Sequence, residues 1–326
     1  MMRFWVDAWD PSYAADADGG GPAQPSTAEL NPDVEVPAAA WRPVPYPADV
    51  RAPDTVLLVD GVRRIDARVW TDEGGGASYP ALAASFAAGV VRCDLRRGEA
   101  TVAGTRVGRG LFTASPTAQE VVSGTLRWPV HRVAAGDLTE LSAAVQGPLT
   151  QLEVEVATAA RAAVDDPADL LVVDGPLRGR QHLPRAVGYI KSHRSRYLPP
   201  ELSSVVTALP PGHRSPVFLL GTSWHRYSWY LRLPGGSGAP WSGVVRVECA
   251  AELTASAAVA LADLSAVTLP RFAAVAYKDP RAPQNLVPIA GLEHRLRALL
   301  GDARLLHRAL ARAAAGSARP AGSARP

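Results

Sequence analysis

Two short runs of apolar, mostly β-branched residues each lead directly into an aspartate and a glycine. The first is Thr55–Gly61 (TVLLVDG) and the second is Asp169–Gly175 (DLLVVDG). Continuous apolar runs of this length are typical of strands that are buried on both faces of a sheet. We therefore expect two neighbouring strands in the middle of a mixed or parallel sheet, with Asp60 and Asp174 at the same edge.

Two carboxylates side by side repel each other unless a hard divalent cation lies between them. The repeated pattern therefore predicts a metal site at Asp60 and Asp174. The ordinary alternative is a turn, because Asp–Gly often follows a strand and glycine lets the chain change direction. The similar apolar runs before Asp60 and Asp174 favour a metal site. For either Asp–Gly step taken alone, the turn interpretation stays open.

The pattern on either side of these strands predicts a mixed α/β domain. Residues 65–70, 85–94 and 99–107 predict an antiparallel meander with the first strand. The spacing changes to helical steps between Asp137, a candidate N-cap, and Ala163, with a break at Gly147–Pro148. After the second Asp–Gly we expect strands at 186–191, 216–220, 227–233 and 243–248, and helices at 251–264, 291–299 and 303–313.

Composition predicts the domain boundaries. Residues 1–54 are expected to form an N-terminal strand at 3–9 and then a flexible arm rich in Pro, Gly, Ala and Asp. Residues 55–314 would form the main domain. Residues 315–326 repeat AGSARP twice, so we expect a disordered tail.

Overall composition excludes several classes of protein. The 326 residues are 47% hydrophobic, enough for a sizeable core, and the net charge of +3 permits a nucleic-acid partner without requiring one. Two cysteines make neither a disulfide framework nor a zinc cluster. Without a long apolar run or a signal-peptide core, the expectation is a soluble cytoplasmic protein.

The remaining candidate chemistry rests on carboxylates. There is no phosphate-binding P-loop, dinucleotide fingerprint or nucleophile elbow, and the seven histidines are scattered without the spacing of zinc ligands. Hard oxygen ligands select Mg²⁺ or Mn²⁺, which activate water and neutralise phosphate charge. Glu153 and Glu155 lie on the helix before the second strand, and at most one of them faces the sheet.

The order of these features resembles the NurA nuclease family. The resemblance rests on the two Asp–Gly strands, the acidic helix before the second, Gly188–Lys191 after it, the strand pair Trp229–Arg232 and Val245–Glu248, and a C-terminal Pro-x-x-Leu segment. It covers about residues 55–310 and is one of order and spacing. It implies a ribonuclease H-like fold and Mn²⁺-dependent (or Mg²⁺-dependent) DNA cleavage. It also implies a homodimer that acts in DNA end processing with a HerA-like hexameric ATPase.

The resemblance also implies roles for single residues. Asp60 and Asp174 match the two aspartates of the family, and Glu155 is our choice for its helix glutamate, with Glu153 close behind. These three would hold Mn²⁺. Lys191 would contact the scissile phosphate as a point charge, and the alternative is a solvated lysine at a strand end.

Basic and aromatic residues near the two aspartates predict contacts with DNA. Four arginines flank the aspartates and are well placed for a DNA backbone: Arg63, Arg64, Arg178 and Arg180. The simpler interpretation is that they form ion pairs with those same acids. Three aromatic residues offer surfaces for base stacking, although such residues more often fill a core: Trp224, Trp229 and Tyr230.

The chain departs from the family near its C-terminal end. There the family carries Tyr-Pro-x-x-Leu-x-x-Ala-His with the Tyr and His near the metal, whereas this chain has alanine at both positions, Ala282 and Ala290. Asp279, Asn285 and His294 are the candidates to replace them. Pro176 also stands where the family has a small polar residue after the second Asp–Gly.

These observations leave three functions open. The first is a metal-dependent DNA nuclease, and the second is a catalytically degenerate DNA-binding subunit of a translocase complex. The third is an actin-like ATPase, a fold that also places Asp–Gly steps at strand ends beside a metal-bound phosphate. It ranks last because the Asp60–Arg64 segment (DGVRR) is a poor glycine-rich phosphate loop.

Overall fold

The computed structural model describes residues 24–72, 78–134, 136–164, 166–193, 195–236 and 238–317. The strand expected at residues 3–9 and most of the expected tail lie outside these residues. The expected start of that tail at residue 315 was placed too early, because the last helix continues to Ser317.

The strands expected within the described residues are present, with shifts at their ends, whereas six short strands, at 24–25, 29–31, 121–123, 126–128, 130–132 and 195–196, were not predicted. In chain order the strands are β1 (Gln24–Pro25), β2 (Glu29–Asn31), β3 (Thr55–Asp72), β4 (Ser78–Asp94), β5 (Glu99–Thr113), β6 (Val121–Ser123), β7 (Leu126–Trp128), β8 (Val130–Arg132), β9 (Leu170–Asp174), β10 (Ala186–Ile190), β11 (Ser195–Arg196), β12 (Phe218–Gly221), β13 (His225–Arg232) and β14 (Val244–Ala250). β1 pairs with β11, β6 pairs with β7, and the other ten strands form one sheet.

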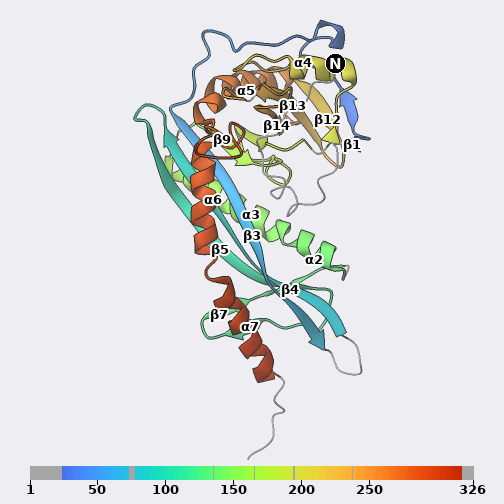
Figure 1. Ribbon diagram of the computed structural model, residues 1–326, viewed down its shortest axis with the longest axis vertical. Helices are drawn as coiled ribbons and strands as arrows, with labels where there is room; N and C mark the ends of the chain where they lie inside the picture. The colour runs from blue at the N-terminus through green and yellow to red at the C-terminus, as the bar shows by residue number, and fades with distance from the viewer. Residues whose placement is uncertain are drawn as a thin grey trace, which may run out of the picture. The chain divides into compact units, whose positions relative to one another are not determined.

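The strand order of the large sheet is β2-β12-β13-β14-β10-β9-β3-β4-β5-β8. Short connections join β3, β4 and β5, as in an antiparallel meander. β9 then pairs parallel to β3, and β10 pairs parallel to β9 (Figure 1). Three antiparallel strands followed by a helix and by strands added parallel beside the first are the ribonuclease H-like arrangement. The expected fold class, a mixed sheet with flanking helices, is confirmed.

The helices follow the helical spacing of the sequence. They are α2 (Leu138–Ala144), α3 (Gln146–Val164), α4 (Pro200–Thr207), α5 (Ala255–Thr268), α6 (Val287–Leu299) and α7 (Ala303–Ser317), with short 3₁₀ turns at Ala38–Ala40 and Leu269–Phe272. Asp137 caps α2 as expected, because its side chain accepts a hydrogen bond from the amide of Glu140 at 2.8 Å. The break at Gly147–Pro148 falls in the first turn of α3.

The described chain divides into two compact units, each assembled from segments far apart in the sequence. Unit 1 comprises residues 1–59, 91–101 and 160–291, and unit 2 comprises residues 60–90, 102–159 and 292–326. Strands β3, β4 and β5 contribute residues to both units. The expected division into an arm, one main domain and a tail remains a prediction.

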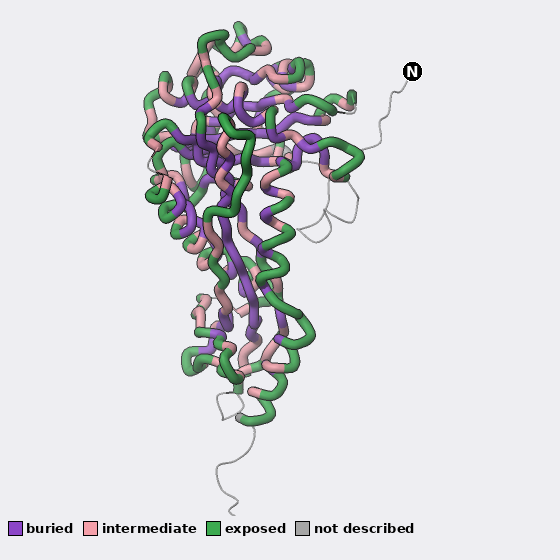
Figure 2. Tube along the Cα trace, turned by 90° about the vertical axis from the view of Figure 1, so that its left-hand side faces the viewer, coloured by how far each residue is buried: buried purple, intermediate pink, exposed green. Residues whose placement is uncertain are grey.

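The core of unit 1 is built on the central strands. Val56–Val59 of β3 and Leu170–Val173 of β9 are almost completely buried, as their apolar runs predict (Figure 2). Helix α5 packs on β13 and β14 (Figure 1), and Trp229 donates its indole N–H to Ser265 of α5 at 3.0 Å. Burying this large ring with its polar group satisfied contributes strongly to the core.

Unit 2 has its own apolar cluster. Residues of β4, β5, β7 and α7 make it: Ala81, Ala83, Leu111, Trp128, Leu306 and Leu310. A side chain at Gly89 of β4 would meet Leu292 and Leu296 of α6, so this glycine lets the helix approach the strand closely. Helices α6 and α7 thus supply apolar faces to unit 2, as their helical spacing predicts.

The expected flexible arm is partly a structural element of unit 1. β2 pairs antiparallel with β12, and Trp41 is buried against Phe218. Glu35 accepts two hydrogen bonds, each 2.8 Å long, from the buried guanidinium of Arg214, which also donates to Asp263 at 2.7 Å. The composition of residues 24–54 favoured a loose linker, but these few apolar and acidic contacts attach the segment to the sheet.

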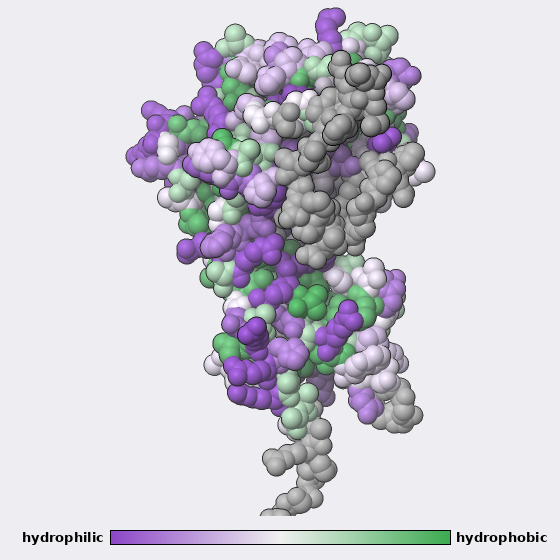
Figure 3. All heavy atoms as spheres, viewed as in Figure 1, coloured by the Kyte–Doolittle hydropathy of each residue, from purple (hydrophilic) through white to green (hydrophobic). Residues whose placement is uncertain are grey.

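The surface of the described chain carries mixed polar and apolar residues. On the face shown in Figure 3, apolar residues are scattered among hydrophilic ones. Single exposed apolar side chains are normal on protein surfaces. None of the helices in the described part of the chain is both long enough and apolar enough to cross a membrane.

Replacing Arg214 by methionine is expected to destabilise the protein strongly. The change leaves the carboxylates of Glu35 and Asp263, only 15% and 12% exposed, without their shared cation. Breaking a buried pair in this way costs about 3–5 kcal/mol in the free energy of unfolding. Urea unfolding of wild type and variant measures the loss.

Arg297→Met is the matched control. Arg297 pairs with Glu293 on α6, but its side chain is 63% exposed, so the loss should stay within about 1 kcal/mol. Equal losses in the two variants would contradict the view that Arg214 ties residues 24–54 to the sheet.

Candidate functional site

The register of β3 and β9 brings the two Asp–Gly steps to corresponding positions of neighbouring strands. Val59 lies opposite Val173 in the parallel pairing, and each valine directly precedes its aspartate. Asp60 belongs to unit 2 and Asp174 to unit 1. The expected juxtaposition of the two strands is confirmed.

The two Asp–Gly steps differ in conformation. β3 continues through Gly61 to Asp72, and Gly61 has no positive φ, so the turn interpretation is wrong at this step. The carboxylate of Asp60 accepts a hydrogen bond from the amide of Gly61 at 2.7 Å. At the second step β9 ends at Asp174, and Gly175 has φ +101°, a conformation that favours glycine.

Gly61 is needed because helix α3 lies directly against it. A Cβ atom at this position would lie 2.8 Å from Leu149 Cδ1 and closer still to Glu153 Oε1. Real Cβ atoms essentially never come this close to other atoms. The glycine therefore makes the space that the Glu153 carboxylate occupies beside the backbone that carries Asp60.

The helix glutamate that faces the strand is Glu153, which corrects our choice of Glu155. Glu153 is 3% exposed, whereas Glu155 is exposed and accepts a hydrogen bond from Gln151 at 3.2 Å. Two residues apart on a helix point in clearly different directions, so only one of the pair faces inward. The spacing predicted this division but not which residue lies inside.

Asp174 forms a partly buried ion pair with Lys191. One carboxylate oxygen accepts a hydrogen bond from the Lys191 ammonium at 2.7 Å, and the side chains are 13% and 16% exposed. The other oxygen, Oδ1, is buried without a hydrogen-bond partner. The sequence did not predict this contact, which shows that the solvated-lysine alternative is wrong, and the contact of Lys191 with a scissile phosphate stays a prediction.

A second partner of Lys191 comes from the segment where the chain departs from the family. The ammonium donates to Asn285 Oδ1 at 3.1 Å, and Asn285 Nδ2 donates to Asp279 at 2.5 Å. Asn285 and Asp279, two of the three candidate replacements for the family's Tyr and His, are therefore linked to Asp174 through Lys191. The third, His294, is exposed on α6 in unit 2.

A buried tyrosine lies beside Asp174 on the neighbouring strand β10. Tyr189 of β10 is opposite Asp174 in register and fully buried, and its hydroxyl donates to the carbonyl of Gln284 at 2.6 Å. Burial raises the pKa of Tyr189 well above its ordinary value, and the charge of Asp174 raises it further. Tyr189 therefore stays neutral and acts as a hydrogen-bond donor at this site.

A cluster around Glu248 was missed by the sequence analysis. This fully buried carboxylate accepts from the amide of Leu177 at 2.8 Å, from Arg246 at 2.6 Å and from Arg226 at 3.1 Å. It thereby holds the loop that follows Asp174. The available signal was the alternation of Arg246 and Glu248 with valines in β14, which places two charges on one face of a buried strand.

The four arginines expected to contact DNA are placed differently. Arg63 and Arg64 lie within β3 and not in a loop: Arg63 donates to the carbonyl of Ser142 at 2.6 Å, and Arg64 pairs with Asp66 at 3.0 Å. Arg180 is buried and donates to the carbonyl of Pro176 at 2.9 Å. Arg178 is exposed in the same turn and is the best placed of the four to meet a phosphate.

The candidate stacking residues are mainly structural. Trp229 and Tyr230 are buried in the core, as their commoner role predicts. Trp224 packs against the guanidinium of Arg226, whose central carbon lies 5.0 Å from the centre of the indole ring. This contact is a cation–π pair next to the Glu248 cluster.

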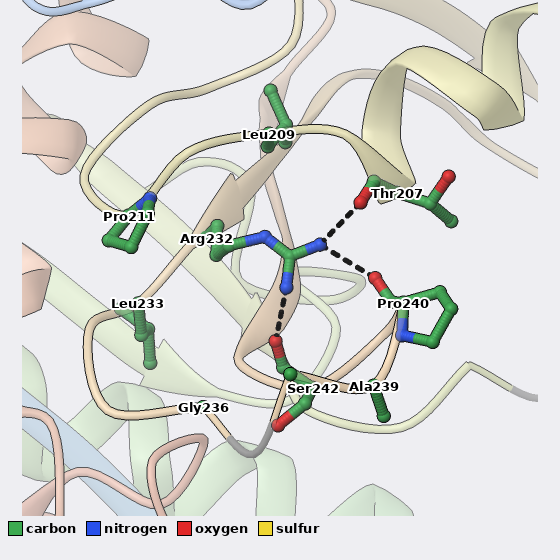
Figure 4. Close-up of a pocket in the computed structure, with 10 residues that line it drawn as sticks. Thr207, Leu209, Pro211, Arg232, Leu233, Gly236, Ala239, Pro240 and Ser242 are labelled. Atoms are coloured by element: carbon green, nitrogen blue, oxygen red, sulfur yellow. Dashed lines mark hydrogen bonds between the residues drawn. The ribbon is translucent and has the colours of Figure 1, made fainter. Parts of the chain in front are cut away.

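A cavity within unit 1 is lined by none of these acids. It has a volume of about 300 Å³ and lies between the end of α4 and the loop that follows β13 (Figure 4). Its charged side chain, Arg232, donates to the carbonyls of Thr207, Pro240 and Ser242. These bonds fasten the loop, so Arg232 has a structural role.

Within the residues that the structure describes, no three His, Cys, Asp or Glu side chains converge closely enough to hold a metal ion. Carboxylates whose oxygens suit a hard cation stay separate candidates, namely Asp60 and Glu153 in unit 2 and Asp174 in unit 1. The unpaired Oδ1 of Asp174 is an oxygen of the kind that Mg²⁺ and Mn²⁺ bind.

Gly61→Ala tests the close approach of α3. The added methyl group must push Glu153 or Leu149 aside, and overpacking of this kind costs about 1–3 kcal/mol. Chemical denaturation measures the loss. Gly104→Ala is the matched control in β5, since no atom lies within 4 Å of its added Cβ, and it should be nearly neutral. A neutral Gly61→Ala would contradict the packing of Glu153 against the strand.

Comparison with known proteins finds a family match for the middle and later part of the chain. Residues 149–292 match the NurA domain, a segment that includes Glu153, Asp174, Lys191 and Asn285, whereas Asp60 precedes it. No curated protein matches the chain. Among solved structures, endonuclease V from Bacillus subtilis is similar over 79% of this chain and 85% of that chain, with 13% identity and a TM-score of 0.32, which is too low to carry an argument. Residues 149–292 of this chain are therefore similar to the NurA domain.

Proposed function

We propose that this chain is a divalent-metal-dependent nuclease that hydrolyses phosphodiester bonds in DNA, in end processing or repair. The observation that carries the proposal is the Asp174–Lys191 pair inside the NurA domain. It places a carboxylate with one unpaired oxygen next to a partly buried ammonium group. Such a pair suits a nuclease, because the carboxylate can bind a cation while the ammonium attracts the substrate phosphate.

Asp60, Glu153 and Asp174 are the residues that would hold Mn²⁺ or Mg²⁺. All three are acidic, and Asp60 and Glu153 are nearly inaccessible to solvent at 7% and 3% exposure. Carboxylate oxygens suit these hard ions, and thiolates or imidazoles would select others. When bound, such an ion lowers the pKa of a coordinated water and neutralises phosphate charge.

The remaining groups bind and orient the substrate. Lys191 provides a compact positive charge that Asp174 and Asn285 hold in place. Arg178, exposed two turn residues after Pro176, provides a second cation for the DNA backbone. Tyr189 excludes water from the strand beside Asp174. Developing charge on a phosphate is stabilised most when cations are held in advance.

A catalytically degenerate DNA-binding subunit is the second candidate function. Alanine at positions 282 and 290, where the family has its Tyr and His, favours it. DNA as the substrate, a homodimer and a HerA-like hexameric ATPase as partner are proposals that rest on the similarity to the NurA family alone.

Cleavage of end-labelled single- and double-stranded DNA tests the proposal. Wild type is expected to cut with Mn²⁺ or Mg²⁺ and not with EDTA. Asp60→Asn, Asp174→Asn and Glu153→Gln should each lower the rate by on the order of 100-fold, since even indirect partners of metal ligands cost 10–100-fold.

Glu155→Gln is the matched control, because it makes the same chemical change on the exposed face of α3. It should keep nearly the full rate. DNA retained in a gel shift without cleavage would favour the degenerate subunit. Metal-dependent cleavage that Glu155→Gln abolishes while Glu153→Gln does not would overturn the assignment of the helix carboxylate.

A further inference from the structure

Lys191 is held from two sides by groups of different kinds. Asp174 supplies a charged acceptor at 2.7 Å and Asn285 a neutral acceptor at 3.1 Å. A lysine side chain has four rotatable bonds, so one acceptor alone leaves its ammonium free to swing about that contact. Two acceptors from different segments restrict it to one place.

The orientation of the Asn285 amide follows from its other partner. Asp279 is a carboxylate and accepts only, so the NH₂ group of Asn285 must face it, at 2.5 Å. The amide oxygen then points to Lys191, which can only donate. Reversal of the amide would set two acceptors against each other on one side and two donors on the other. Asp279 therefore determines which end of the amide Lys191 meets.

The segment that carries these residues is itself fixed. Asn285 is fully buried, and its backbone is hydrogen-bonded on both sides. Its backbone carbonyl accepts from the backbone N–H of Ala274, and its backbone N–H donates to the carbonyl of Arg281 at 3.0 Å. Asp279 accepts from the backbone and side chain of Arg281 at 2.8 and 3.3 Å. The Asp279 carboxylate is thus held by three donors from its own loop.

The charge state of Asp279 fits this arrangement. Burial alone would raise its pKa, but the hydrogen bonds from Asn285 and Arg281 outweigh this and lower the pKa below its ordinary value. Asp279 is therefore ionised, and accepts from Asn285, throughout the neutral range.

We propose that Asn285 is a positioning residue for Lys191, and that Asp279 orients its amide so that the oxygen holds the ammonium beside Asp174. The inference rests on the proposed function for its catalytic consequence, because positioning matters to the reaction only if Lys191 meets the substrate phosphate. The geometric part stands on the contacts alone.

The chain offers a direct test, because Lys191 and Lys278 are its only two lysines. Protein labelled with ¹⁵N at the lysine side-chain nitrogens gives one ammonium signal for each lysine. Lys278 is exposed and serves as an internal reference. In Asn285→Ala the Lys191 signal should shift and broaden toward that of a solvated lysine, while the Lys278 signal stays in place. Asp279→Asn should move the Lys191 signal in the same direction by a smaller amount.

A structural control separates positioning from general loosening of the segment. Leu286→Ala alters the next residue, which is also fully buried, but leaves both partners of Lys191 in place. It should leave the Lys191 signal near its wild-type position. A Lys191 signal that is unchanged in Asn285→Ala, or that moves equally in Leu286→Ala, overturns the inference.

Kinetics test the consequence for the reaction. Asn285→Ala should lower kcat by about tenfold or more with a smaller change in KM. The double variant Lys191→Ala/Asn285→Ala should be no slower than Lys191→Ala, because Asn285 acts through the lysine. Additive losses overturn the positioning role. A wild type without nuclease activity overturns the proposed function. The ¹⁵N signals of the two lysines then still show whether Asn285 holds Lys191 in place.

Discussion

The parallel pairing of β3 with β9 is the constraint on which the candidate site depends. In parallel strands the register is continuous, so Val59 opposite Val173 aligns the two apolar runs residue by residue. Val56–Val59 and Leu170–Val173 are almost completely buried, so this pairing forms the centre of the unit 1 core. The same strand β9 then leads directly to Asp174, which places this acid at the end of a rigid, buried element.

Three buried acids in unit 1 have their negative charge neutralised by arginines. Asp169 pairs with Arg161, Asp263 with Arg214, and Glu248 with Arg226 and Arg246, all through planar guanidinium groups that can bond several acceptors in fixed directions. Asp174 differs because its partner is one of only two lysines in the chain. An ammonium is a compact point charge, which suits the phosphate contact proposed for Lys191.

Sequence reasoning predicted the strands well because their burial pattern is local. The apolar runs before Asp60 and Asp174 and the cap at Asp137 depend on residues close in the chain. The choice between Glu153 and Glu155 depended on which face of α3 meets Gly61, a contact across about 90 residues of sequence. The links from Glu35 to Arg214 and from Lys191 to Asn285 join segments farther apart still, and no local pattern contains them. At Gly61 a turn stayed open as the alternative, because a glycine needed for space beside a helix and a glycine needed for a turn look the same in the sequence.

The alanines at 282 and 290 are the strongest reason to consider a protein that has lost its reaction, yet the surrounding contacts argue against simple decay. A carboxylate, an amide and an ammonium buried together are costly unless each is satisfied. A subunit freed from catalysis could replace them with apolar residues at little cost, or at a gain. Instead Asn285 is fully buried and bonded on both sides, and Asp279 is anchored by its own loop. The proposed positioning of Lys191 by Asn285 would give this costly arrangement a use, so these contacts support the proposed nuclease over the degenerate subunit.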